Sequence, residues 1–382
     1  MTACGQTDSS QLRVAIAAPF PPPSGGMSVQ AMKLCSRLTA EGFAVDAVPT
    51  NPQLPRYAGF LGSYPGARTL VREVQYLFSL FRCVCRCAII HHLSASGIYF
   101  FLHSAPLLVL GRLWKRRLIL NYRGGRAADF LSSWSWIVVP LMHLADRVAV
   151  PSEFLQRIFK RHSIESCILP NIADLELFPF RQSMEFAPRL LATRNLEPMY
   201  NVECALRAFR IVQNRFPHAT LGIAGAGSEA KRLAGLVDEW RLLGVTFYGA
   251  VPHEKLPALY DQHDVYVNSS DVDNFPGALV EAACSGLVIV STRAGGISDM
   301  IRDRESGLLV DLNDHEGLAT AVLACLNDQD LARGLTRAAR HWAEQFCWPK
   351  IFPRLMDCYG LSPALDSSLG QERAPIQQSS YI

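Results

Sequence analysis

The stretch DVDNFPGALVEA, residues 271–282, contains two acidic pairs whose spacings suit different chemistry. Asp271 and Asp273 form a D-x-D pair, which can hold a divalent metal ion against a diphosphate. Asp273 and Glu281 lie eight positions apart, across a Pro-Gly corner and into an expected helix. This second spacing suits hydrogen bonding to sugar and ribose hydroxyls without a metal. The surrounding architecture decides which pair matters.

Glu281 and Arg194 are the charged residues with the clearest candidate roles. Glu281 falls in the first turns of the expected helix, and its carboxylate can accept two hydrogen bonds from a vicinal diol. A purely surface position suits it poorly, because its neighbours Val280 and Ala282 are apolar. Arg194 ends the expected strand 189–194, where a cation can neutralise a leaving diphosphate or form an ordinary salt bridge.

Two glycine pairs follow expected strands in the two halves of the chain. Gly25 and Gly26 separate the first strand from the first helix, where bare amides can face a phosphate or simply make a tight turn. Gly225 and Gly227 take the corresponding place in the second half. The full G-x-G-x-x-G is missing, so dinucleotide binding is not indicated, and a nucleotide's diphosphate or ribose nearby remains an option.

The elements that must position these residues read as two strand–helix series. In the first half, expected strands are 12–20, 43–49, 87–95, 117–122 and 147–152, and the clearest helix is 27–42. In the second half they are 189–194, 219–227, 245–249, 265–270, 287–292 and 307–311, alternating with helices. Short apolar runs that alternate with amphipathic helices indicate parallel α/β sheets. We therefore expect an α/β protein of two doubly wound domains, whose strand carboxyl ends face one cleft.

Length and charge agree with this division. The chain has 382 residues, more than one hydrophobic core usually serves. Residues 1–190 contain 20 Lys/Arg against 11 Asp/Glu, a net charge of +9, whereas residues 191–382 contain 17 against 23, a net charge of −6. Residues 171–188 are rich in Pro and acids and read as the connector.

The basic, aromatic-rich segment 77–117 suggests an anionic partner. It can rest on an anionic membrane surface and present a lipid-linked acceptor, or it can be a solvated basic face with no partner. Nucleic acid would use similar charge, but no recognition module is evident. The most apolar stretch, 97–111, is shorter than the ~20 residues that span a bilayer. The first ten residues lack the basic and apolar regions of a signal peptide, so we expect a cytoplasmic protein, peripheral on the cytoplasmic membrane face.

The chain resembles the family 4 retaining glycosyltransferases (glycosyl transferases group 1), which have the GT-B fold of two Rossmann-like domains facing a central cleft. The resemblance runs from about Leu12 to Tyr359 and rests on motifs in family order and spacing. These are the Gly25–Gly26 loop, ADRVAVPSEFL (145–155), ILPNIADLELF (168–178), GIAGAGSEAKRL (222–233), residues 245–270, DNFPGALVEAACSGLVIVSTRAGGISDMI (273–301) and GLLVDLND (307–314).

The resemblance implies the domain roles. An acceptor-binding domain is expected at 11–175 and a nucleotide-sugar-binding domain at 188–346. A C-terminal helix at 347–362 should return to the first domain, followed by a disordered tail at 363–382. The reaction it implies is transfer of a sugar from a UDP-, GDP- or ADP-linked donor to a glycan, lipid-linked or small-molecule acceptor, with retention of anomeric configuration. No metal or other cofactor is expected.

The resemblance also assigns residues. Glu281 is expected to hold the donor ribose, Asp273 to lie near the donor sugar hydroxyls, and Arg194 to lie on the diphosphate. Phe275, Pro276 and Gly277 match the backbone stretch beside the sugar and phosphates. Gly25, Gly26, Gly225 and Gly227 complete the expected donor site.

Two departures from the family's pattern qualify these roles. The family usually has a lysine where Met199 or Tyr200 stands here, and a histidine in an HGG-like turn where this chain has Arg123 before Gly124 and Gly125. We hypothesise that Arg123 partly compensates for the missing cation or binds a phosphate-bearing or carboxylated acceptor. Two other readings remain open: a nucleotide-sugar-binding protein with impaired catalysis, and a GT-B nucleotide-sugar epimerase or hydrolase.

Overall fold

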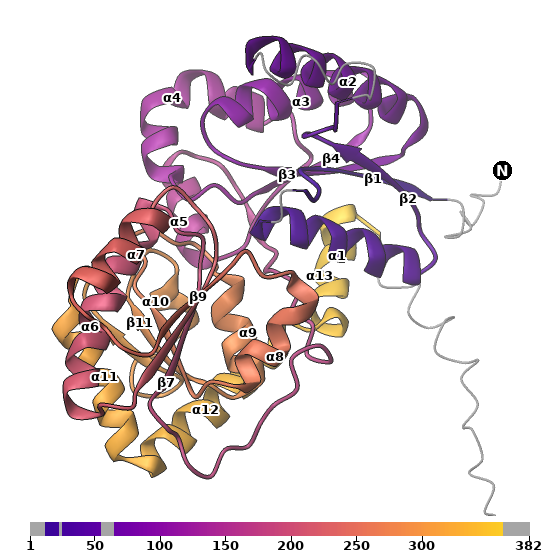
Figure 1. Cartoon of the computed structure of the whole chain (residues 1–382). Coiled ribbons are helices and arrows are strands. Elements are labelled where there is room, and N and C mark those ends of the chain that lie inside the picture. The colour runs from indigo at the N-terminus through magenta and orange to yellow at the C-terminus, as the bar shows by residue number, and fades with distance from the viewer. Residues whose placement is uncertain (1–11, 23–24, 55–64, 362–382) are drawn as a thin grey trace, which may run out of the picture.

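The computed structural model describes residues 12–22, 25–54 and 65–361. Within these residues the chain forms two six-stranded sheets, one in each half of the sequence (Figure 1). All pairings within the two sheets are parallel. The predicted tail at 363–382 lies outside the described residues.

The first sheet has the strand order β2-β1-β3-β4-β5-β6 and the second has the order β12-β11-β10-β7-β8-β9. The strands of the first are β1 (Arg13–Ala18), β2 (Ala44–Pro49), β3 (Ile89–Ser94), β4 (Arg117–Tyr122), β5 (Arg147–Val150) and β6 (Cys167–Ile168). Those of the second are β7 (Arg189–Thr193), β8 (Thr220–Ala224), β9 (Val245–Gly249), β10 (Val265–Asn268), β11 (Val288–Thr292) and β12 (Leu308–Val310).

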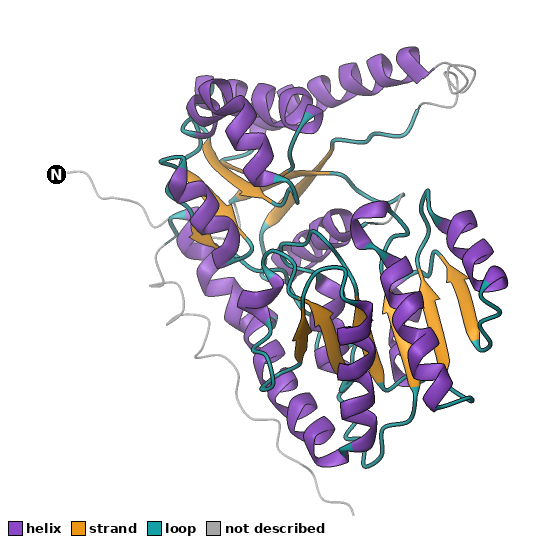
Figure 2. Ribbon diagram, turned by 90° about the vertical axis from the view of Figure 1, so that its left-hand side faces the viewer, coloured by secondary structure: helices purple, strands orange, loops and turns teal. Residues whose placement is uncertain are grey.

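The apolar runs of the sequence become the central strands because helices cover both faces of each sheet (Figure 2). In β1 every residue from Val14 to Ala18 is inaccessible to solvent, and in β11 the whole strand is buried. Each of the eleven strands predicted from the sequence is present. The two-residue strand β6 was not predicted, because Cys167 and Ile168 form too short an apolar run to give a strand signal.

Helices connect the strands of each sheet. In the first half they are α1 (Gly26–Ala40), α2 (Pro65–Arg86), a π-helix at Phe100–Ser104 that runs into α3 (Ala105–Leu113), α4 (Ala127–Met142) and α5 (Glu153–Arg161). In the second half they are α6 (Val202–Arg215), α7 (Ala230–Glu239), α8 (Leu256–Asp261), α9 (Gly277–Ser285), α10 (Ile297–Met300), α11 (His315–Asn327) and α12 (Gln329–Ala343). No helix among the described residues is both long and apolar enough to cross a bilayer.

The last helix, α13 (Trp348–Tyr359), returns to the first half of the chain. Its residues Ile351 and Leu355 are buried in one cluster with Val14 and Ile16 of β1. Figure 1 shows α13 beside α1. The last helix therefore packs on the first sheet and not on the second.

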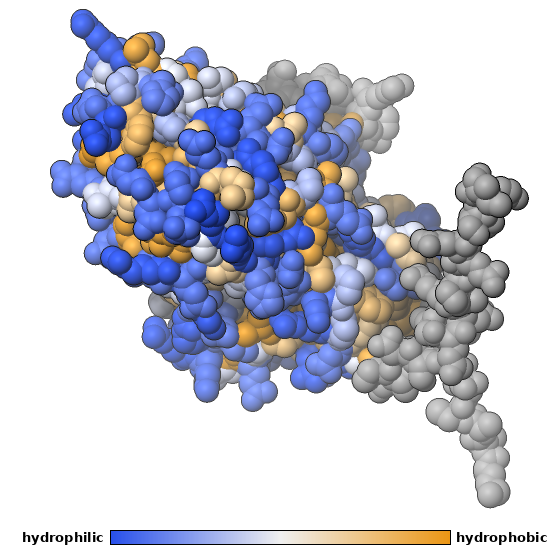
Figure 3. Space-filling view, turned by 90° about the horizontal axis from the view of Figure 1, so that it is seen from below, coloured by the Kyte–Doolittle hydropathy of each residue, from blue (hydrophilic) through white to orange (hydrophobic). Residues whose placement is uncertain are grey.

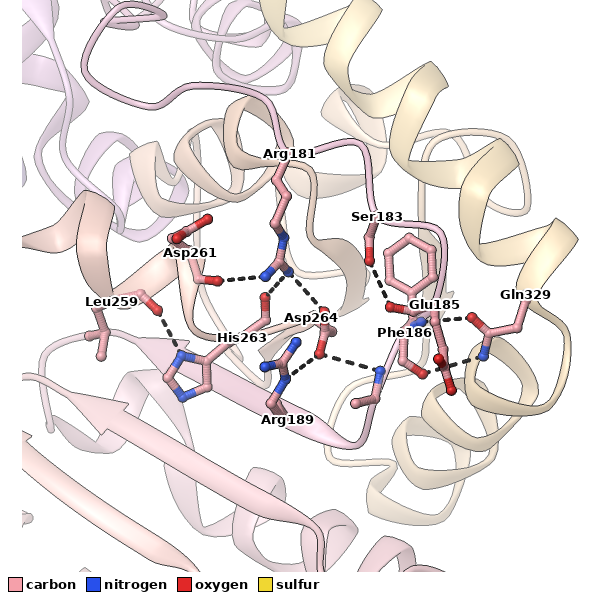
Figure 4. A network of polar contacts seen from close by, with 11 residues as sticks. Arg181, Ser183, Glu185, Phe186, Arg189, Leu259, Asp261, His263, Asp264 and Gln329 are labelled. Carbon is pink, nitrogen blue, oxygen red and sulfur yellow. Dashed lines mark hydrogen bonds and ion pairs between the residues drawn. The ribbon is translucent and has the colours of Figure 1, made fainter.

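The connector before β7 is tied to the second sheet by a buried carboxylate (Figure 4). Asp264, which is inaccessible to solvent, accepts from Arg181 at 2.8 Å and from Arg189 at 2.6 Å. Hydrogen bonding to Asp264 raises the pKa of Arg189, which favours the charged form of that guanidinium. This cluster fixes the course of the chain from one half into the other.

Candidate functional site between the two sheets

The carboxyl ends of the two sheets meet at direct hydrogen bonds. Asn274, in the loop after β10, donates to the Gly124 carbonyl after β4 at 2.7 Å. Asn171, which follows the first sheet, donates to the Phe275 carbonyl at 3.0 Å. Because ligands of parallel α/β sheets bind at strand carboxyl ends, this junction is the candidate site.

Arg194 and Asp273 form an ion pair at the centre of this junction. Both side chains are largely buried, with 13% and 11% exposed. Burial raises the pKa of Asp273, an effect that Arg194 and the Asn274 amide offset only in part. Burial alone would lower the pKa of Arg194, but Asp273 and nearby tyrosines raise it above its ordinary value. Arg194 is therefore a fixed cation at the end of β7.

Tyr200, one of the two residues at the sequence position where a lysine was expected, lies beside Arg194. The Arg194 guanidinium lies over the Tyr200 ring, 4.2 Å from its centroid. The aromatic face stabilises the cation but cannot supply a second positive charge. Tyr200 therefore adds no second cation beside Arg194.

Glu281 lies on α9 with both carboxylate oxygens already bound. His253 Nε2 donates to Oε1 at 3.0 Å and the Tyr260 hydroxyl donates to Oε2 at 3.1 Å. Burial raises the pKa of Tyr260 well above its usual value, so its hydroxyl remains protonated and can donate. Thr193, next to Arg194, bonds the same hydroxyl at 2.7 Å. One hydrogen-bonded chain thus connects Glu281 to the end of β7.

A cavity lies between α1 and α9, and Glu281 lines it. It is also lined by Gly277, by Lys33 of α1, and by Asn171 and Asp174 of the connector. Lys33 pairs with Asp174 at 2.9 Å. Burial would raise the pKa of Asp174, but Lys33 and Arg37 lower it below its usual value. The cavity therefore has one wall from each half of the molecule, as a cleft site requires.

Phe275, Pro276 and Gly277, which were predicted to offer backbone atoms to the donor, lie at and just before the start of α9. Phe275 turns its ring into the core against Phe346, with centroids 5.1 Å apart, so it offers its backbone to the cleft. Pro276 precedes the first turn of α9 and Gly277 opens it, which leaves amides at the helix start. Both positions agree with a phosphate near this helix end.

The two glycine pairs have local roles. The Gly25 amide is already engaged, because it donates to Ser28 Oγ at 2.8 Å. A Cβ added to Gly25 or Gly26 would meet no atom within 4 Å. The Gly225 amide donates to the Gly249 carbonyl at 2.8 Å. A Cβ on Gly225 or Gly227 would collide with the carbonyls of Arg194 and Leu196. These last two glycines allow the chain after β8 to pack against the chain after β7.

The D-x-D carboxylates face different partners. Asp271 accepts from Asn201 Nδ2 at 3.2 Å, whereas Asp273 pairs with Arg194. Among the described residues no group of three His, Cys, Asp or Glu side chains is arranged to hold a metal ion. The structure thus groups Asp273 with Arg194 and not with Asp271.

Arg123 lies on the opposite side of the junction, directly after β4. Its guanidinium donates to Asn171 Oδ1, and its Nε has no hydrogen-bond partner among the described residues. Burial lowers the pKa of Arg123 to about 10. Arg123 is therefore a buried cation at the carboxyl edge of the first sheet.

Sequence reasoning missed His253, Tyr260, Asn171 and Asn274. His253 and Asn274 lie in the segments that follow β9 and β10, so a rule that collects polar residues after each strand would have found them. Tyr260 lies inside α8 among apolar residues and gives no such signal, because only the tertiary fold brings it to Glu281.

Residues 179–342 match the family model described as "Glycosyl transferases group 1". Over 246 residues the chain is 28% identical to a glycogen synthase of Mycobacterium tuberculosis. This match covers 63% of this chain and 59% of that protein. It is 25% identical over 274 residues to a GDP-mannose-dependent alpha-(1-6)-phosphatidylinositol monomannoside mannosyltransferase of Mycolicibacterium smegmatis, covering 63% of this chain and 70% of that protein. The first match thus spans less than two thirds of its relative's length.

Among solved structures, the chain is similar to sucrose-phosphate synthase from Thermosynechococcus elongatus. The TM-score is 0.74 with 21% sequence identity, covering 94% of this chain and 100% of that one. At this identity the likeness shows the fold alone. The fold is GT-B, as predicted from the sequence.

Proposed function

We propose that this chain, whose residues 179–342 belong with the glycosyl transferases of group 1 and whose fold is GT-B, transfers a sugar from a nucleotide-sugar donor to an acceptor. One observation carries the proposal. Arg194, Asp273, Glu281 and the start of α9 gather at the carboxyl edge of the second sheet, where Glu281 and Gly277 line a cavity whose other wall comes from the first half of the chain. The cation suits a diphosphate, and the carboxylate suits a ribose diol.

Catalysis by this arrangement is a matter of position and charge. Arg194 and the amides at the start of α9 would stabilise the negative charge that develops on the departing diphosphate. Arg123 lies across the junction, on the side from which an acceptor would approach. Holding donor and acceptor together in the cleft removes the entropic cost of their encounter.

We propose further that transfer proceeds with retention and without a metal. Asp273 is engaged by Arg194 and Glu281 by His253 and Tyr260, so neither carboxylate is free to act as a nucleophile. Retention, which the resemblance to the retaining transferases implies, would then require the acceptor hydroxyl to attack on the face from which the diphosphate leaves. The diphosphate oxygen then takes the hydroxyl proton. The separate partners of Asp271 and Asp273 support a donor site that works without a metal bridge.

The test begins with UDP-, GDP- and ADP-linked sugars as additives in thermal unfolding. A donor that binds only the native state raises the midpoint. The stabilising donor is then incubated with candidate acceptors, with and without EDTA, and the product is examined by NMR. We expect transfer that is insensitive to EDTA and a product with the donor's anomeric configuration. An inverted product, or activity lost to EDTA and restored by manganese, would contradict these two features.

A rival function is binding of a nucleotide sugar without turnover. It is favoured by one observation, the tyrosine that replaces the usual lysine beside Arg194. In that case the thermal screen would succeed and no acceptor would ever be glycosylated. Release of free sugar without acceptor would instead indicate a hydrolase, and a changed donor sugar would indicate an epimerase.

We also propose that α2 and the end of α3 dock on an anionic membrane surface. Five large apolar side chains form an exposed stripe along α2, and Phe78 is 65% exposed. The stripe consists of Leu70, Val74, Leu77, Phe78 and Phe81. Trp114 extends it from α3, since its ring packs edge-on against Phe81 at 5.6 Å. An amphipathic helix with this exposed face is typical of interfacial binding.

The charge beside this stripe selects anionic lipids. Four exposed cations lie near it, namely Arg82, Arg86, Arg112 and Lys115. Juxtaposed apolar and basic side chains bind anionic leaflets through both area and charge. Figure 3 shows another face of the molecule, seen from below, on which hydrophilic residues are interspersed with small hydrophobic groups.

Flotation with phosphatidylcholine vesicles, with and without phosphatidylglycerol, tests this surface. We expect recovery on the anionic vesicles only, weakened by salt and by Phe78→Glu. Leu243→Glu is the matched control, because Leu243 is 71% exposed on the other half of the chain. Equal recovery on both vesicle types would refute the proposal.

A further inference from the structure

Arg123 is held in place by neutral groups only. Its backbone amide donates to the Ser94 carbonyl at 2.8 Å, and its guanidinium donates to Asn171 Oδ1. Asn171 is fixed in turn by its bond to the Phe275 carbonyl at 3.0 Å. The guanidinium is therefore oriented, and among the described residues it forms no ion pair with a carboxylate.

The surroundings of Arg123 lack the groups that would complete its shell. Its Nε is buried without an acceptor, and the Oδ1 of neighbouring Asn121 is buried without a donor. Burying a charge without a counter-ion lowers the stability of the folded state. A site that retains such a charge is suited to a ligand that brings the opposite one.

The cavity beside Arg123 belongs to the first half of the chain. Its polar lining consists of Gln30, His91, Asn121 and Arg123, while α13 adds apolar residues. None of Arg194, Asp273 and Glu281 lines it. Burial lowers the pKa of His91 to about 3, so His91 is neutral and Arg123 is the cation of this cavity.

Arg194 differs in this respect, because Asp273 already neutralises it. The Arg123 turn still touches the donor side through Gly124, whose carbonyl accepts from Asn274. An anion on Arg123 would thus lie in the first domain and next to the predicted donor sugar.

We propose that Arg123 binds an anionic group, a phosphate or a carboxylate, carried by the acceptor. The proposal rests on the transferase function proposed above and names the chemical class of its acceptor. An anion bound here would be recognised by charge and by the planar guanidinium, which presents parallel N–H donors. Asn121 can accept from a hydroxyl of the same molecule.

The test is calorimetric titration of inorganic phosphate, and separately of acetate, into the full chain saturated with whichever of UDP, GDP or ADP it binds. We expect at least one anion to bind the nucleotide-loaded protein. Arg123→Gln should weaken this binding by about tenfold or more while changing nucleotide affinity less than about twofold. Arg126→Gln is the matched control, because Arg126 is exposed three residues away and its loss changes net charge equally.

Three outcomes would overturn the proposal. Anion binding that disappears once the nucleotide is bound, or Arg123→Gln that weakens the nucleotide itself, would assign Arg123 to the donor diphosphate. Equal anion affinity in the wild type and in Arg123→Gln would show that Arg123 does not bind the anion. If none of the nucleotides binds, the transferase proposal fails, and titration into the free protein still decides whether Arg123 binds an anion. Thermal unfolding of Arg123→Gln checks that the variant folds, and its midpoint should not fall, because a buried charge has been removed.

Discussion

Two pairs of arginines in this molecule differ in what surrounds them. Around Asp264, Arg181 and Arg189 share one buried carboxylate with contacts of 2.8 and 2.6 Å (Figure 4). In the cleft, Arg194 has a carboxylate of its own, whereas Arg123 has only an amide oxygen. The first pair lies at the amino edge of the second sheet, where β7 and β10 begin. The cleft arginines lie at the carboxyl edges of the two sheets.

The partner of a buried charge and its place in the sheet distinguish a charge that stabilises the fold from one that binds a ligand. Breaking a buried ion pair is destabilising because it leaves an uncompensated charge, so a paired cluster away from the cleft, such as that at Asp264, serves the fold. Arg194 is also paired, but it lies at the carboxyl edge of the sheet, where ligands bind. A buried cation without a carboxylate contributes no such stability. Its presence in a cleft therefore points to a ligand, and variants of the two clusters should affect different properties.

The largest effect should come from Arg194→Ala. Turnover should fall by about 10² to 10³, because the variant removes the cation that stabilises the leaving group. Arg157→Ala is the control, since Arg157 forms an interdomain pair with Asp299 at 2.9 Å but is 54% exposed. That variant should lose less than about 1 kcal/mol of stability and little turnover. Unchanged turnover in Arg194→Ala would remove Arg194 from the mechanism.

Asp264→Ala should affect stability instead. It leaves two arginines without their shared carboxylate and should lower the free energy of unfolding by about 3 kcal/mol. Urea denaturation measures this loss, and nucleotide affinity at low temperature should be unchanged. Gln329→Ala, which removes neutral hydrogen bonds to the backbone of Phe186 and Leu326, is a milder variant of the same region. A loss below about 1 kcal/mol for Asp264→Ala would show that the cluster is not structural.

The next effect concerns pH. Burial lowers the pKa of both His91 and His92 to about 3 in the first sheet. The unfolded chain takes up these two protons near pH 6.5 and the folded chain does not, so stability is full above that pH and falls as the pH drops toward 3. Between pH 7 and pH 5 the loss should be about 2 kcal/mol per histidine.

Arg123 connects this pH effect to the cleft. Burial is the largest cause of the low pKa of His91, and the positive charge of Arg123 is the second largest. Urea unfolding at several pH values should therefore show a shallower pH dependence in Arg123→Gln and in His91→Asn than in the wild type. Parallel curves for all three proteins would show that His91 does not titrate as described.

The sequence predicted most of the fold because its strands are continuous apolar runs, as parallel buried strands require. It also predicted which side chains would share the cleft, since Arg194, Asp273 and Glu281 all lie just after strands or at a helix start. The partner of each charge could not be predicted. The pairing of Arg194 with Asp273 joins positions 79 residues apart, and Tyr260 reaches Glu281 from inside an apolar helix.

The family's pattern was informative where this chain departs from it. The substitution of the usual lysine by Met199 and Tyr200 gave no sign that the tyrosine ring would lie under Arg194 at 4.2 Å. Likewise, YRGG indicated a cation at Arg123 but not that Asn171 would orient it. Such contacts depend on the tertiary fold around each residue, which a local pattern does not encode.

The most direct test of the account is the binding of UDP, GDP and ADP and of their 2′-deoxy counterparts to the wild type and to Glu281→Ala. If Glu281 holds a ribose diol, one nucleotide binds the wild type, and removing either the 2′-hydroxyl or the carboxylate weakens it by about tenfold. Removing both should then cost little more than removing one. Independent, additive losses, or an unchanged affinity in Glu281→Ala, would contradict the central claim that the ribose of a nucleotide sugar is bound by Glu281 in the cleft between the two sheets.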